Sequence, residues 1–528
     1  LNSKETACEK PIKREGGGGT MLEVIKRDGG RTVFDRSKIT VAIEKAMNSS
    51  SGVYEIGQAD KIAWEIEQEA RQQEKPLTIY EIEDKVYYKL IENHNPATAR
   101  AYENYKAVQA FKRHENTTDE SIFGLLNKSN IAVLDENSNK DAHVVSTQRD
   151  LIAGEVSKDI ARRKLIPADI VQAHDSGAIH FHDMDYIIQP MFNCCLINLE
   201  DMLTNGTVIN GKKIDSPKSF QVACTVTTQI IAQVASGQYG GQSINGIDRI
   251  LAPFVRKSFN KILKSVLEEQ RDIYEMEPDQ AKAEAIAWKR TRKEVKDGIQ
   301  TIQYQINTLM TTNGQAPFVT LFMYFQPDYE YAKEAAMITE EILAQRFEGV
   351  KNEQNVYITP AFPKLVYVLD EHNITPDAPY YYLTELAAKC TAKRMYPDYI
   401  SAKKMRENYE GNVFSPMGCR SFLRPYKNEQ GEYVWDGRFN QGVVSLNLPQ
   451  IGILAEHSEE KFFEILEKRL QLCYKALMLR YDFLKDVVSD VSPIHWQYGA
   501  IARLKPGEKI YPYLQNTYST LSLGYIGV

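Results

Sequence analysis

The stretch Arg438-Phe439-Asn440-Gln441-Gly442-Val443-Val444-Ser445-Leu446-Asn447-Leu448-Pro449 carries the pattern that decides the fold. It begins with polar side chains and continues as an apolar run, which predicts a loop that enters a buried strand. Short apolar runs at Phe318 to Tyr324 and at Lys364 to Leu369 indicate further strands. Because these strands alternate with helical stretches, the sequence predicts an α/β fold, for which we favour a barrel.

Three stretches around these strands carry a helical pattern. Gln148 to Arg163 and Pro217 to Ser236 are predicted helices, and Ser216 followed by Pro217 is a typical helix start. The long charged stretch from Phe254 to Met310 is also predicted to be helical. Gly237-Gln238-Tyr239-Gly240-Gly241 lacks the Lys-Ser/Thr pair of a phosphate-binding loop, so we interpret it as a helix stop and a turn.

The composition is typical of a folded protein. Of the 528 residues, 43% are hydrophobic and 25% are charged, and the formal net charge is -6. This balance argues against disorder and against a strongly basic nucleic-acid-binding surface over the whole chain. No apolar stretch is long enough to span a membrane, and the polar N-terminus does not resemble a signal peptide. The seven cysteines include no pair with zinc-ribbon spacing, so we expect reduced thiols and a cytoplasmic location.

The pattern divides the chain into three parts. Residues 1–20 contain four consecutive glycines at 16–19, and we expect a flexible leader or a segment added to the natural sequence. Residues 21–115 are predicted to form a small, mostly helical module. Residues 116–528 are predicted to form the α/β domain, with Asn116-Thr117-Thr118 as a polar linker at its start.

Local signals define the elements of the small module. Asp28-Gly29-Gly30 lies between two short strands and predicts a hairpin. Asp35 is placed to cap the helix that follows. Thr78 and Glu81 have the spacing of a capping box, and a last helix is expected from about Ala97 to His114.

A cysteine in a tight loop stands shortly before the deciding strand. In Ser415-Pro416-Met417-Gly418-Cys419-Arg420-Ser421, a proline and a glycine stand before Cys419 in a tight loop, which places the thiol for reactivity rather than packing. From the segment alone, a structural thiol in a turn is an equal alternative. Asn440, at the entry of the strand, is suited to hydrogen-bond a polar substrate without adding charge.

Two polar segments lie near the middle of the chain, His180-Phe181-His182-Asp183 and Asn193-Cys194-Cys195-Leu196-Ile197-Asn198. In a strand, the two histidines of the first segment share a face. They suggest a metal site, but the sequence shows no third ligand at a suitable spacing. Cys194 and Cys195 point in opposite directions in a strand and do not form a natural chelate, so a redox role for one of them is the alternative.

The module at 21–115 resembles the ATP-cone, a nucleotide-sensing domain that regulates ribonucleotide reductases. The resemblance rests on the hairpin, on the helix capped by Asp35 and on the closing helix with Tyr105 and Lys106. By spacing alone, its cations also fit a solvated basic hairpin. The resemblance implies that ATP activates and dATP inhibits through this module, each bound with Mg²⁺. The positions that match the family's nucleotide-binding positions are Lys26, Arg27, Lys38 and Lys106.

Nearly the whole chain, about 21–528, resembles the anaerobic, class III ribonucleoside-triphosphate reductases, which are glycyl-radical enzymes. The resemblance implies a ten-stranded α/β barrel, with Cys419 on a loop threaded inside it. The segments that carry it are Met417-Gly418-Cys419-Arg420-Ser421, Phe439-Asn440-Gln441, the two segments at 180–183 and 193–198, Asn137-Ser138-Asn139-Lys140-Asp141 and Thr147-Gln148-Arg149-Asp150-Leu151.

The family relation also implies a reaction, the reduction of ribonucleoside triphosphates to 2′-deoxyribonucleoside triphosphates. Cys419 matches the cysteine that a glycyl radical oxidises to a thiyl, which then abstracts the 3′-hydrogen of the ribose. Cys194 matches the second active-site thiol, for which Cys195 is less suited. Asn440 matches the asparagine that positions the substrate or formate. The further substrate-binding candidates are Ser421, Met417 and His180.

Two departures from the other reductase classes point to an external reductant. Those classes carry a glutamate two residues after the radical cysteine, where this chain has Ser421, and they reduce with a cysteine pair. No cysteine lies between Cys419 and Cys473 to complete such a pair. The resemblance implies formate as the reductant.

The same resemblance implies several partners. They are a radical-SAM activase, dNTP effectors, and a second subunit in a homodimer that forms higher oligomers with dATP. A specificity-setting nucleotide site is expected near the subunit interface, for which the long helices after Pro217 are candidates. No membrane and no nucleic acid are expected as partners.

The family's zinc site and radical glycine lie in a C-terminal segment with an Arg-Val-x-Gly-Tyr type motif. This sequence stops at Val528, and its Gly524-Tyr525 pair lacks the Arg-Val context. We therefore do not assign Gly524 as the radical glycine, and we assign no metal ligand in this chain. Either the sequence is truncated or a further segment follows, and as given the chain is expected to be unable to start the chemistry.

Two other functions remain as alternatives. The first is a glycyl-radical enzyme of the pyruvate formate-lyase or diol dehydratase type, which the ATP-cone disfavours because such enzymes need no nucleotide sensing. The second is a non-catalytic ATP-cone nucleotide sensor, such as a transcriptional repressor. Repressors of that kind are small and carry a zinc ribbon, whereas this chain has no paired cysteines and a large α/β part.

Overall fold

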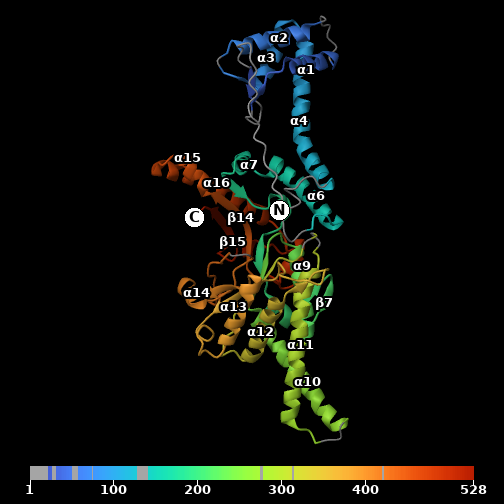
Figure 1. Ribbon diagram of the computed structural model, residues 1–528, viewed down its shortest axis with the longest axis vertical. Helices are drawn as coiled ribbons and strands as arrows, with labels where there is room; N and C mark the ends of the chain where they lie inside the picture. The colour runs from blue at the N-terminus through green and yellow to red at the C-terminus, as the bar shows by residue number, and fades with distance from the viewer. Residues whose placement is uncertain are drawn as a thin grey trace, which may run out of the picture. The chain divides into compact units, whose positions relative to one another are not determined.

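The computed structural model divides into two compact units, Leu1–Glu120 and Ser121–Val528, whose elements are shown in Figure 1. The smaller unit is mostly helical and the larger one is α/β, as the sequence predicts. No described helix is both long and apolar enough to cross a membrane. The residues that the structure describes are 22–25, 31–49, 57–73, 75–127, 141–273, 277–311, 314, 316–418 and 421–527.

The smaller unit packs its helices on a sheet with the strand order β2-β1-β3. Strands β1 and β2 are antiparallel, as expected of the predicted hairpin, and β1 and β3 are parallel. The strands are β1 (Glu23–Ile25), β2 (Arg31–Val33) and β3 (Leu77–Thr78), and the helices are α1 (Arg36–Ser49), α2 (Gln58–Arg71), α3 (Ile79–Glu92) and α4 (Pro96–Leu126).

The predicted caps of this unit are confirmed. The Ser37 amide N–H donates to Asp35 Oδ1 at 3.1 Å, so Asp35 satisfies an amide that the helix itself leaves without a partner. Thr78 and Glu81 form the reciprocal pair of a capping box at the start of α3. Behind these caps the helices bury a shared apolar core that includes Ile43, Ile62, Val86 and Leu90.

The predicted linker at Asn116-Thr117-Thr118 is wrong, because α4 continues through it to Leu126. The polar composition suggested a break, but no glycine or proline occurs between Ala97 and Phe123. Asn and Thr cost a helix only a few tenths of a kcal/mol each, so a long helix passes through them.

The larger unit is built on an eight-stranded sheet with the order β13-β12-β9-β8-β5-β14-β15, in which β4 also pairs with β14. Strands β5, β8, β9, β12 and β13 are parallel to one another, whereas β14 runs antiparallel to β5. The sheet therefore has two halves of opposite direction that meet at β5 and β14. The described residues contribute eight strands, where the family resemblance implies ten. The strands are β4 (Ile179–Phe181), β5 (Cys194–Leu196), β8 (Gln242–Asn245), β9 (Val319–Met323), β12 (Lys364–Leu369), β13 (Asp398–Ser401), β14 (Phe439–Asn447) and β15 (Thr520–Ile526).

Helices pack on this sheet and bury a large apolar cluster, of which Phe220, Ile244 and Leu321 are members. Two small hairpins lie outside the main sheet, β6 (Thr207–Ile209) with β7 (Lys212–Ile214) and β10 (Val350–Lys351) with β11 (Tyr357–Ile358). The helices are α6 (Val145–Ile160), α7 (Ala168–Asp175), α8 (Leu199–Thr204), α9 (Phe220–Ser236), α10 (Ile247–Asp272), α11 (Gln280–Thr308), α12 (Ala332–Glu348), α13 (Tyr381–Arg394), α14 (Ala402–Asn408), α15 (Leu448–Ala455), α16 (Glu459–Leu484) and α17 (Pro493–Trp496).

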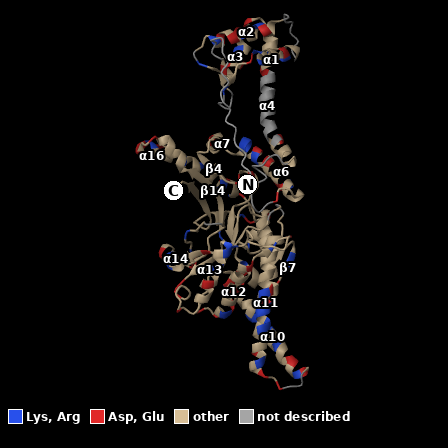
Figure 2. Ribbon diagram, viewed as in Figure 1, with Lys and Arg blue, Asp and Glu red and all other residues tan. Residues whose placement is uncertain are grey.

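Two helix predictions need correction. Helix α9 begins at Phe220 instead of Pro217, because Ser219 is the residue whose side chain accepts a hydrogen bond from the Val222 amide. The stretch predicted as one helix over 254–310 is two helices, α10 and α11. The second starts after Pro278 with Asp279 as its cap. Figure 2 shows Lys and Arg residues along both helices.

Candidate functional site

Cys194 and Asn440 lie directly opposite each other where the two halves of the sheet meet. Strand β5 pairs antiparallel with β14, with Asn440 opposite Cys194 and Phe439 opposite Cys195. The Asn193 amide donates to the Asn440 carbonyl at 2.9 Å and fixes this register. Because directly opposite residues of an antiparallel pair present their side chains on one face, the two predicted catalytic residues are neighbours.

The two adjacent cysteines of β5 have different surroundings. Cys195 is fully buried in the core, and burial raises the pKa of its thiol well above the usual value. Cys194 is half-buried, and its Sγ lies 3.2 Å from Asn193 Oδ1, to which it donates. The prediction that the two thiols point in opposite directions is confirmed, and only Cys194 lies on the face of Asn440.

The tip of the predicted cysteine loop reaches Cys194. A Cβ on Gly418 would lie 2.8 Å from Cys194 Sγ, and the φ of Gly418 is +61°. Two strands hold this glycine: its N–H donates to Ser243 Oγ of β8 at 3.0 Å, and Thr320 Oγ1 of β9 donates to its carbonyl at 2.9 Å. Cys419 and Arg420 lie outside the described residues. In the sequence, Cys419 directly follows Gly418, the glycine at which a Cβ would lie against Cys194 Sγ.

The remaining loop residues anchor this tip. The Met417 N–H donates to the Ser421 carbonyl at 2.7 Å, so the chain folds back on itself around Cys419. Ser415 donates its N–H to Asn245 Oδ1 at 2.9 Å. The Met417 side chain is buried in an apolar cluster with Phe414. Met417 and Ser421 therefore bracket the loop tip, and their proposed contact with substrate stays a prediction.

A glycine pair beside Cys194 was interpreted from the sequence only as part of a turn. Gly237 does end α9, but a Cβ on Gly240 would lie 1.9 Å from Asn193 Oδ1 and 2.7 Å from Cys194 Sγ. A Cβ on Gly241 would lie 3.1 Å from Gly418 Cα. Because these two glycines have no side chains, the loop can approach the thiol. Two glycines directly before a strand were the sequence signal that could have indicated this close approach.

Asn440 is held by two hydroxyl groups that sequence reasoning missed. Its Nδ2 donates to Thr520 Oγ1 at 3.2 Å and to Ser522 Oγ, both on β15. The residue is 1% exposed. Its Oδ1 has no hydrogen-bond partner among the described residues, so one buried acceptor is left over on the face of Cys194.

His180 lies on β4, which pairs with β14 further along from Asn440. It stands on β4 opposite Ser445, which is five positions past Asn440 on β14, and it is exposed. Its ring centroid is 4.4 Å from that of His182 and 5.0 Å from that of His174. Among the residues that the structure describes, no cluster of three His, Cys, Asp or Glu is suited to hold a metal ion. The role of His180 in substrate binding stays a prediction.

The buried Arg480 of α16 connects β4 to the glycine pair. Its guanidinium donates to the His182 carbonyl at 2.5 Å and to the Asp183 carbonyl at 2.9 Å. The guanidinium also lies 5.2 Å from the ring centroid of Tyr239, and the Tyr239 hydroxyl donates to the Gln441 carbonyl at 3.2 Å. No sequence motif identified this residue, since its partners are main-chain atoms.

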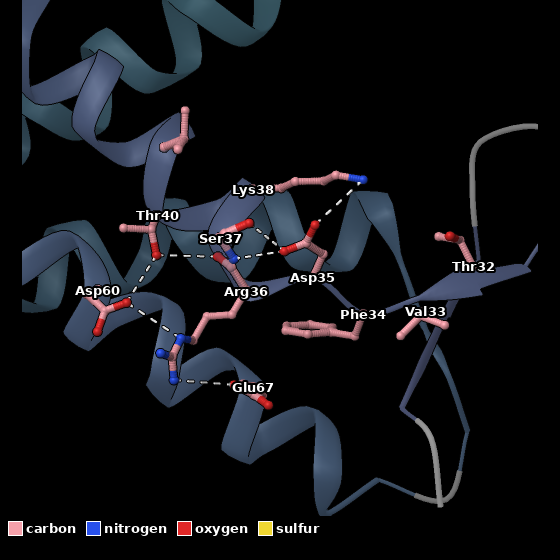
Figure 3. Close-up of a pocket in the computed structure, with 11 residues that line it drawn as sticks. Thr32, Val33, Phe34, Asp35, Arg36, Ser37, Lys38, Thr40, Asp60 and Glu67 are labelled. Carbon is pink, nitrogen blue, oxygen red and sulfur yellow. Dashed lines mark hydrogen bonds and ion pairs between the residues drawn. The ribbon is translucent and has the colours of Figure 1, made fainter. Parts of the chain in front are cut away.

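The smaller unit contains a cavity of about 790 Å³ at the start of α1, which Figure 3 shows with its lining side chains. Lys38 Nζ lies 3.8 Å from Asp35 Oδ2, and the Lys38 side chain is 79% exposed. The Ser37 hydroxyl bond to Asp35 lowers the pKa of that carboxyl. The residues that line the cavity are Thr32, Val33, Phe34, Asp35, Arg36, Ser37, Lys38, Thr40, Val41, Asp60 and Glu67.

Charged residues of α1 and α2 are paired on the inner side of this cavity. Arg36 lies 3.5 Å from Asp60 and 3.7 Å from Glu67, so its charge is matched by two carboxylates. Of the described cations that line the cavity, Lys38 therefore has the more exposed side chain. Lys26 and Arg27 lie outside the described residues, as does the side chain of Lys106 on α4.

Comparisons with known proteins agree over nearly the whole chain. Residues 136–528 match the family described as anaerobic ribonucleoside-triphosphate reductase, and residues 22–110 match the ATP cone domain. The anaerobic ribonucleoside-triphosphate reductase of Salmonella typhimurium is 41% identical over 509 residues, which cover 96% of this chain and 69% of that protein. The enzyme of the same name from Enterobacteria phage T4 is 43% identical over 420 residues, covering 78% and 67%.

A solved structure is similar in fold. The anaerobic ribonucleotide reductase from Thermotoga maritima, with glycerol in its active site, has a TM-score of 0.51 and 13% identity. The match covers 79% of this chain and 67% of that one. At this identity the likeness supports the α/β fold class predicted from the sequence.

Proposed function

The chain belongs to the anaerobic ribonucleoside-triphosphate reductase family, and on that premise we propose that it reduces ribonucleoside triphosphates at the site of Cys194, Asn440 and the loop of Cys419. The family and the ATP cone support nucleotide reduction under allosteric control. The observation that carries the proposal is the approach of the loop tip to the second thiol, 2.8 Å from a Cβ at Gly418 to Cys194 Sγ.

The residues of the site account for each atom that moves. A glycyl radical, when present, supplies the unpaired electron. Cys419, as a thiyl, takes the 3′-hydrogen of the ribose, and the Cys194 thiol donates the proton with which the 2′-hydroxyl leaves as water. Formate supplies two electrons and leaves as carbon dioxide, and the proton that it releases restores the Cys194 thiol. C2′ takes up a proton from solution, and Cys419 then returns its hydrogen to C3′. In sum, a ribonucleotide, formate and a proton give a deoxyribonucleotide, carbon dioxide and water.

Enclosure suits this chemistry because a radical in an open site is quenched by solvent and by other solutes. The pairing of β5 with β14 supports a site in which Cys194 and Asn440 share one face, and the bond from Thr320 to Gly418 supports a Cys419 loop that encloses it. Asn440 adds hydrogen-bonding capacity without charge and positions the substrate. Ser421, Met417 and His180 are further proposed contacts.

The smaller unit is the proposed regulatory site, at which ATP activates and dATP inhibits as Mg²⁺ complexes. The exposed ammonium of Lys38 at a cavity of about 790 Å³ supports this, since a solvent-accessible cation suits a triphosphate. Lys26, Arg27 and Lys106 are the other proposed phosphate contacts. A homodimer that forms higher oligomers with dATP, dNTP effectors at a second site and a radical-SAM activase complete the proposal. The radical glycine and a structural zinc are assigned to a segment outside this sequence.

The test is a thiol substitution in the complete enzyme with activase and formate. Cys419→Ala is expected to abolish deoxynucleotide formation and to leave dATP binding unchanged, whereas Cys473→Ala, a buried thiol on α16, keeps both. Deoxynucleotide formed by the Cys419 variant would contradict the assignment. Labelled formate is expected to release carbon dioxide in equal amount to the deoxynucleotide, and product formed without that release would rule out formate as the reductant.

A further inference from the structure

We propose that Thr520 and Ser522 are positioning residues that orient the Asn440 amide, so that Asn440 presents only an acceptor to the active site and takes a ribose hydroxyl instead of the formate anion. The inference rests on the proposed function, because it assigns the ligand of a residue in that site. The inference goes beyond the proposed function because it assigns Asn440 as a hydrogen-bond acceptor and two hydroxyls of β15 as the groups that position its amide.

The strand register places all of these side chains on one face. Asn440 is opposite Cys194 on β5 and opposite Thr520 on β15. Thr520 and Ser522 are two positions apart in a strand, so their side chains also share a face. The loop comes close to the same face, because a Cβ on Gly418 would lie 2.8 Å from Cys194 Sγ. Whatever Asn440 leaves free is therefore presented beside the Cys194 thiol.

The hydrogen bonds of Asn440 use up its donors. A primary amide has two N–H groups and an oxygen with two lone pairs. Nδ2 donates to Thr520 Oγ1 and to Ser522 Oγ, so both N–H groups have an acceptor on β15. Oδ1 is buried and has no partner among the described residues. A buried carbonyl without a partner costs free energy until a ligand donates to it.

A free acceptor selects its ligand by chemistry. The ribose of a ribonucleotide offers two hydroxyl donors, which an amide oxygen receives well. Formate at neutral pH is an anion with acceptor oxygens only, and it would require the amide N–H groups that β15 occupies. In the opposite amide orientation the hydroxyls would donate to Oδ1 and Nδ2 would face the site. With Nδ2 on the two hydroxyls, as in the structure, Asn440 thus favours the ribose hydroxyl over formate.

A neighbouring amide supplies a matched control. Gln441 Nε2 donates to Ser519 Oγ at 2.9 Å, which is the same kind of bond from β14 to the residue directly before β15. The pairing of β14 with β15 is irregular between Asn440 and Gly442, so Gln441 has no direct strand partner. Removing the Ser519 hydroxyl changes the strand pair locally but leaves both acceptors of Asn440 Nδ2 in place.

The test is nucleotide binding to the 528-residue chain, with ATP at saturation to occupy other nucleotide sites. CTP is compared by calorimetry with 2′-deoxy-CTP and 3′-deoxy-CTP. The unmodified chain is expected to bind CTP about five-fold more tightly than one of the two analogues, as one hydrogen bond provides. In Thr520→Val/Ser522→Ala this preference is expected to vanish, because the amide is no longer held.

Two further variants separate orientation from damage to the fold. Ser519→Ala is expected to keep the preference, and Thr520→Ser/Ser522→Thr, which retains both hydroxyls, is expected to restore it. A preference that survives in Thr520→Val/Ser522→Ala overturns the inference, as does its equal loss in Ser519→Ala. An unmodified chain that binds no CTP overturns the proposed function and the inference with it.

Turnover in the complete enzyme gives a second readout. Thr520→Val/Ser522→Ala is expected to lower kcat/KM for CTP about ten-fold and to leave the KM for formate unchanged. A purely structural role would lower kcat for all substrates without this split. A raised KM for formate with unchanged discrimination between CTP and its deoxy analogues would show that the amide nitrogen faces the site, and the inference would be wrong.

Discussion

At the scale of single residues, the missing side chain of Gly240 shapes the proposed active site. A Cβ there would lie 1.9 Å from Asn193 Oδ1 and 2.7 Å from the Asn193 carbonyl. The backbone atom cannot yield as a flexible side chain would, so Gly240→Ala is expected to shift Cys194. A shift of about 1 Å at a reacting group costs on the order of 100-fold in rate.

The measurement is turnover of Gly240→Ala in the complete enzyme, with dATP binding as a check on folding. Gly452→Ala is the matched control, because no atom lies within 4 Å of a Cβ at that position on α15. A Gly240→Ala enzyme with normal turnover would show that the space beside Cys194 is not needed.

Arg480 leads to a prediction about stability. Arg480→Met removes the donor of two main-chain carbonyls, His182 and Asp183. The Asp183 carbonyl keeps the Tyr186 N–H as a donor, so only the His182 carbonyl loses its side-chain donor. Because an interior acceptor without a partner costs about 1–3 kcal/mol, the larger unit is expected to lose about 1–3 kcal/mol. Lys475→Met on the same helix removes only a half-exposed ion pair with Asp169 and is expected to cost less than about 1 kcal/mol. Denaturant unfolding of both variants checks the difference, and equal losses would contradict it.

The sequence pointed to those candidate residues that carry their own chemical signal. A cysteine that follows a proline and a glycine, a neighbouring thiol pair and an asparagine at a strand entry are visible without a structure. Thr520, Ser522 and Gly240 are not, because their importance lies in the register of β14 with β15 and in a close approach of two chain segments. Hydroxyls and glycines are common, and only tertiary contacts single these out.

At the scale of elements, helix starts show how local signals compete. Ser216-Pro217 and Ser219 both precede the apolar run of α9, and the sequence alone favoured the first. In the structure the Ser219 side chain accepts from the Val222 amide. Ser219→Ala is therefore expected to cost about 1 kcal/mol, whereas Ser216→Ala is expected to change stability by less than about 0.5 kcal/mol. Unfolding curves of the two variants are the measurement, and the reverse order would contradict the assigned cap.

His182, which directly follows β4, leads to a prediction about the pH dependence of stability. Burial, with further contributions from His180, Arg480 and His174, lowers the pKa of His182 to about 4. A lowered pKa means that the folded state binds this proton less readily than the unfolded state, for which about 6.5 is usual. The stability that this neutral imidazole contributes is therefore present above pH 6.5 and is lost as the pH falls toward 4.

The measurement is the Tm of the larger unit between pH 7 and pH 4. In His182→Gln the fall over this window is expected to be smaller than in the unmodified chain. His457→Gln, at an exposed position of the same unit, is the control and is expected to leave the fall unchanged. An identical pH profile for His182→Gln would show that other groups cause the acid loss.

At the scale of the whole molecule, the proposed active site lies where two halves of one sheet meet. Cys194 comes from the parallel half and Asn440 from the strand that opposes it, while the loop of Cys419 is held by β8 and β9. The alternation of strands and helices was enough to predict an α/β fold. The place where the two halves meet was not predictable from spacing, since it depends on which two strands of opposite direction become neighbours.

Each unit has an apolar core of its own, and this organisation gives the last prediction. Ile62 on α2 is fully buried in the core of the smaller unit, among residues of α1, α3 and α4. Heating is therefore expected to show two transitions in calorimetry. Ile62→Ala leaves a cavity that costs about 2–5 kcal/mol, which lowers the Tm of a unit of this size by on the order of 10 °C. The transition of the larger unit, whose apolar clusters do not include Ile62, is expected to stay in place.

Ligand and control variants make the assignment of the two transitions independent of that substitution. A ligand that binds only the folded state of a unit raises the Tm of that unit by mass action. We therefore expect dATP to raise the Tm of the same transition whose Tm Ile62→Ala lowers. Val41→Ala on α1, at a position that is 46% exposed, is expected to shift neither by more than a degree or two, since little apolar surface is lost. In the complete enzyme Ile62→Ala is expected to weaken inhibition by dATP while turnover persists. A single transition that moves as one in every variant would contradict two separate cores.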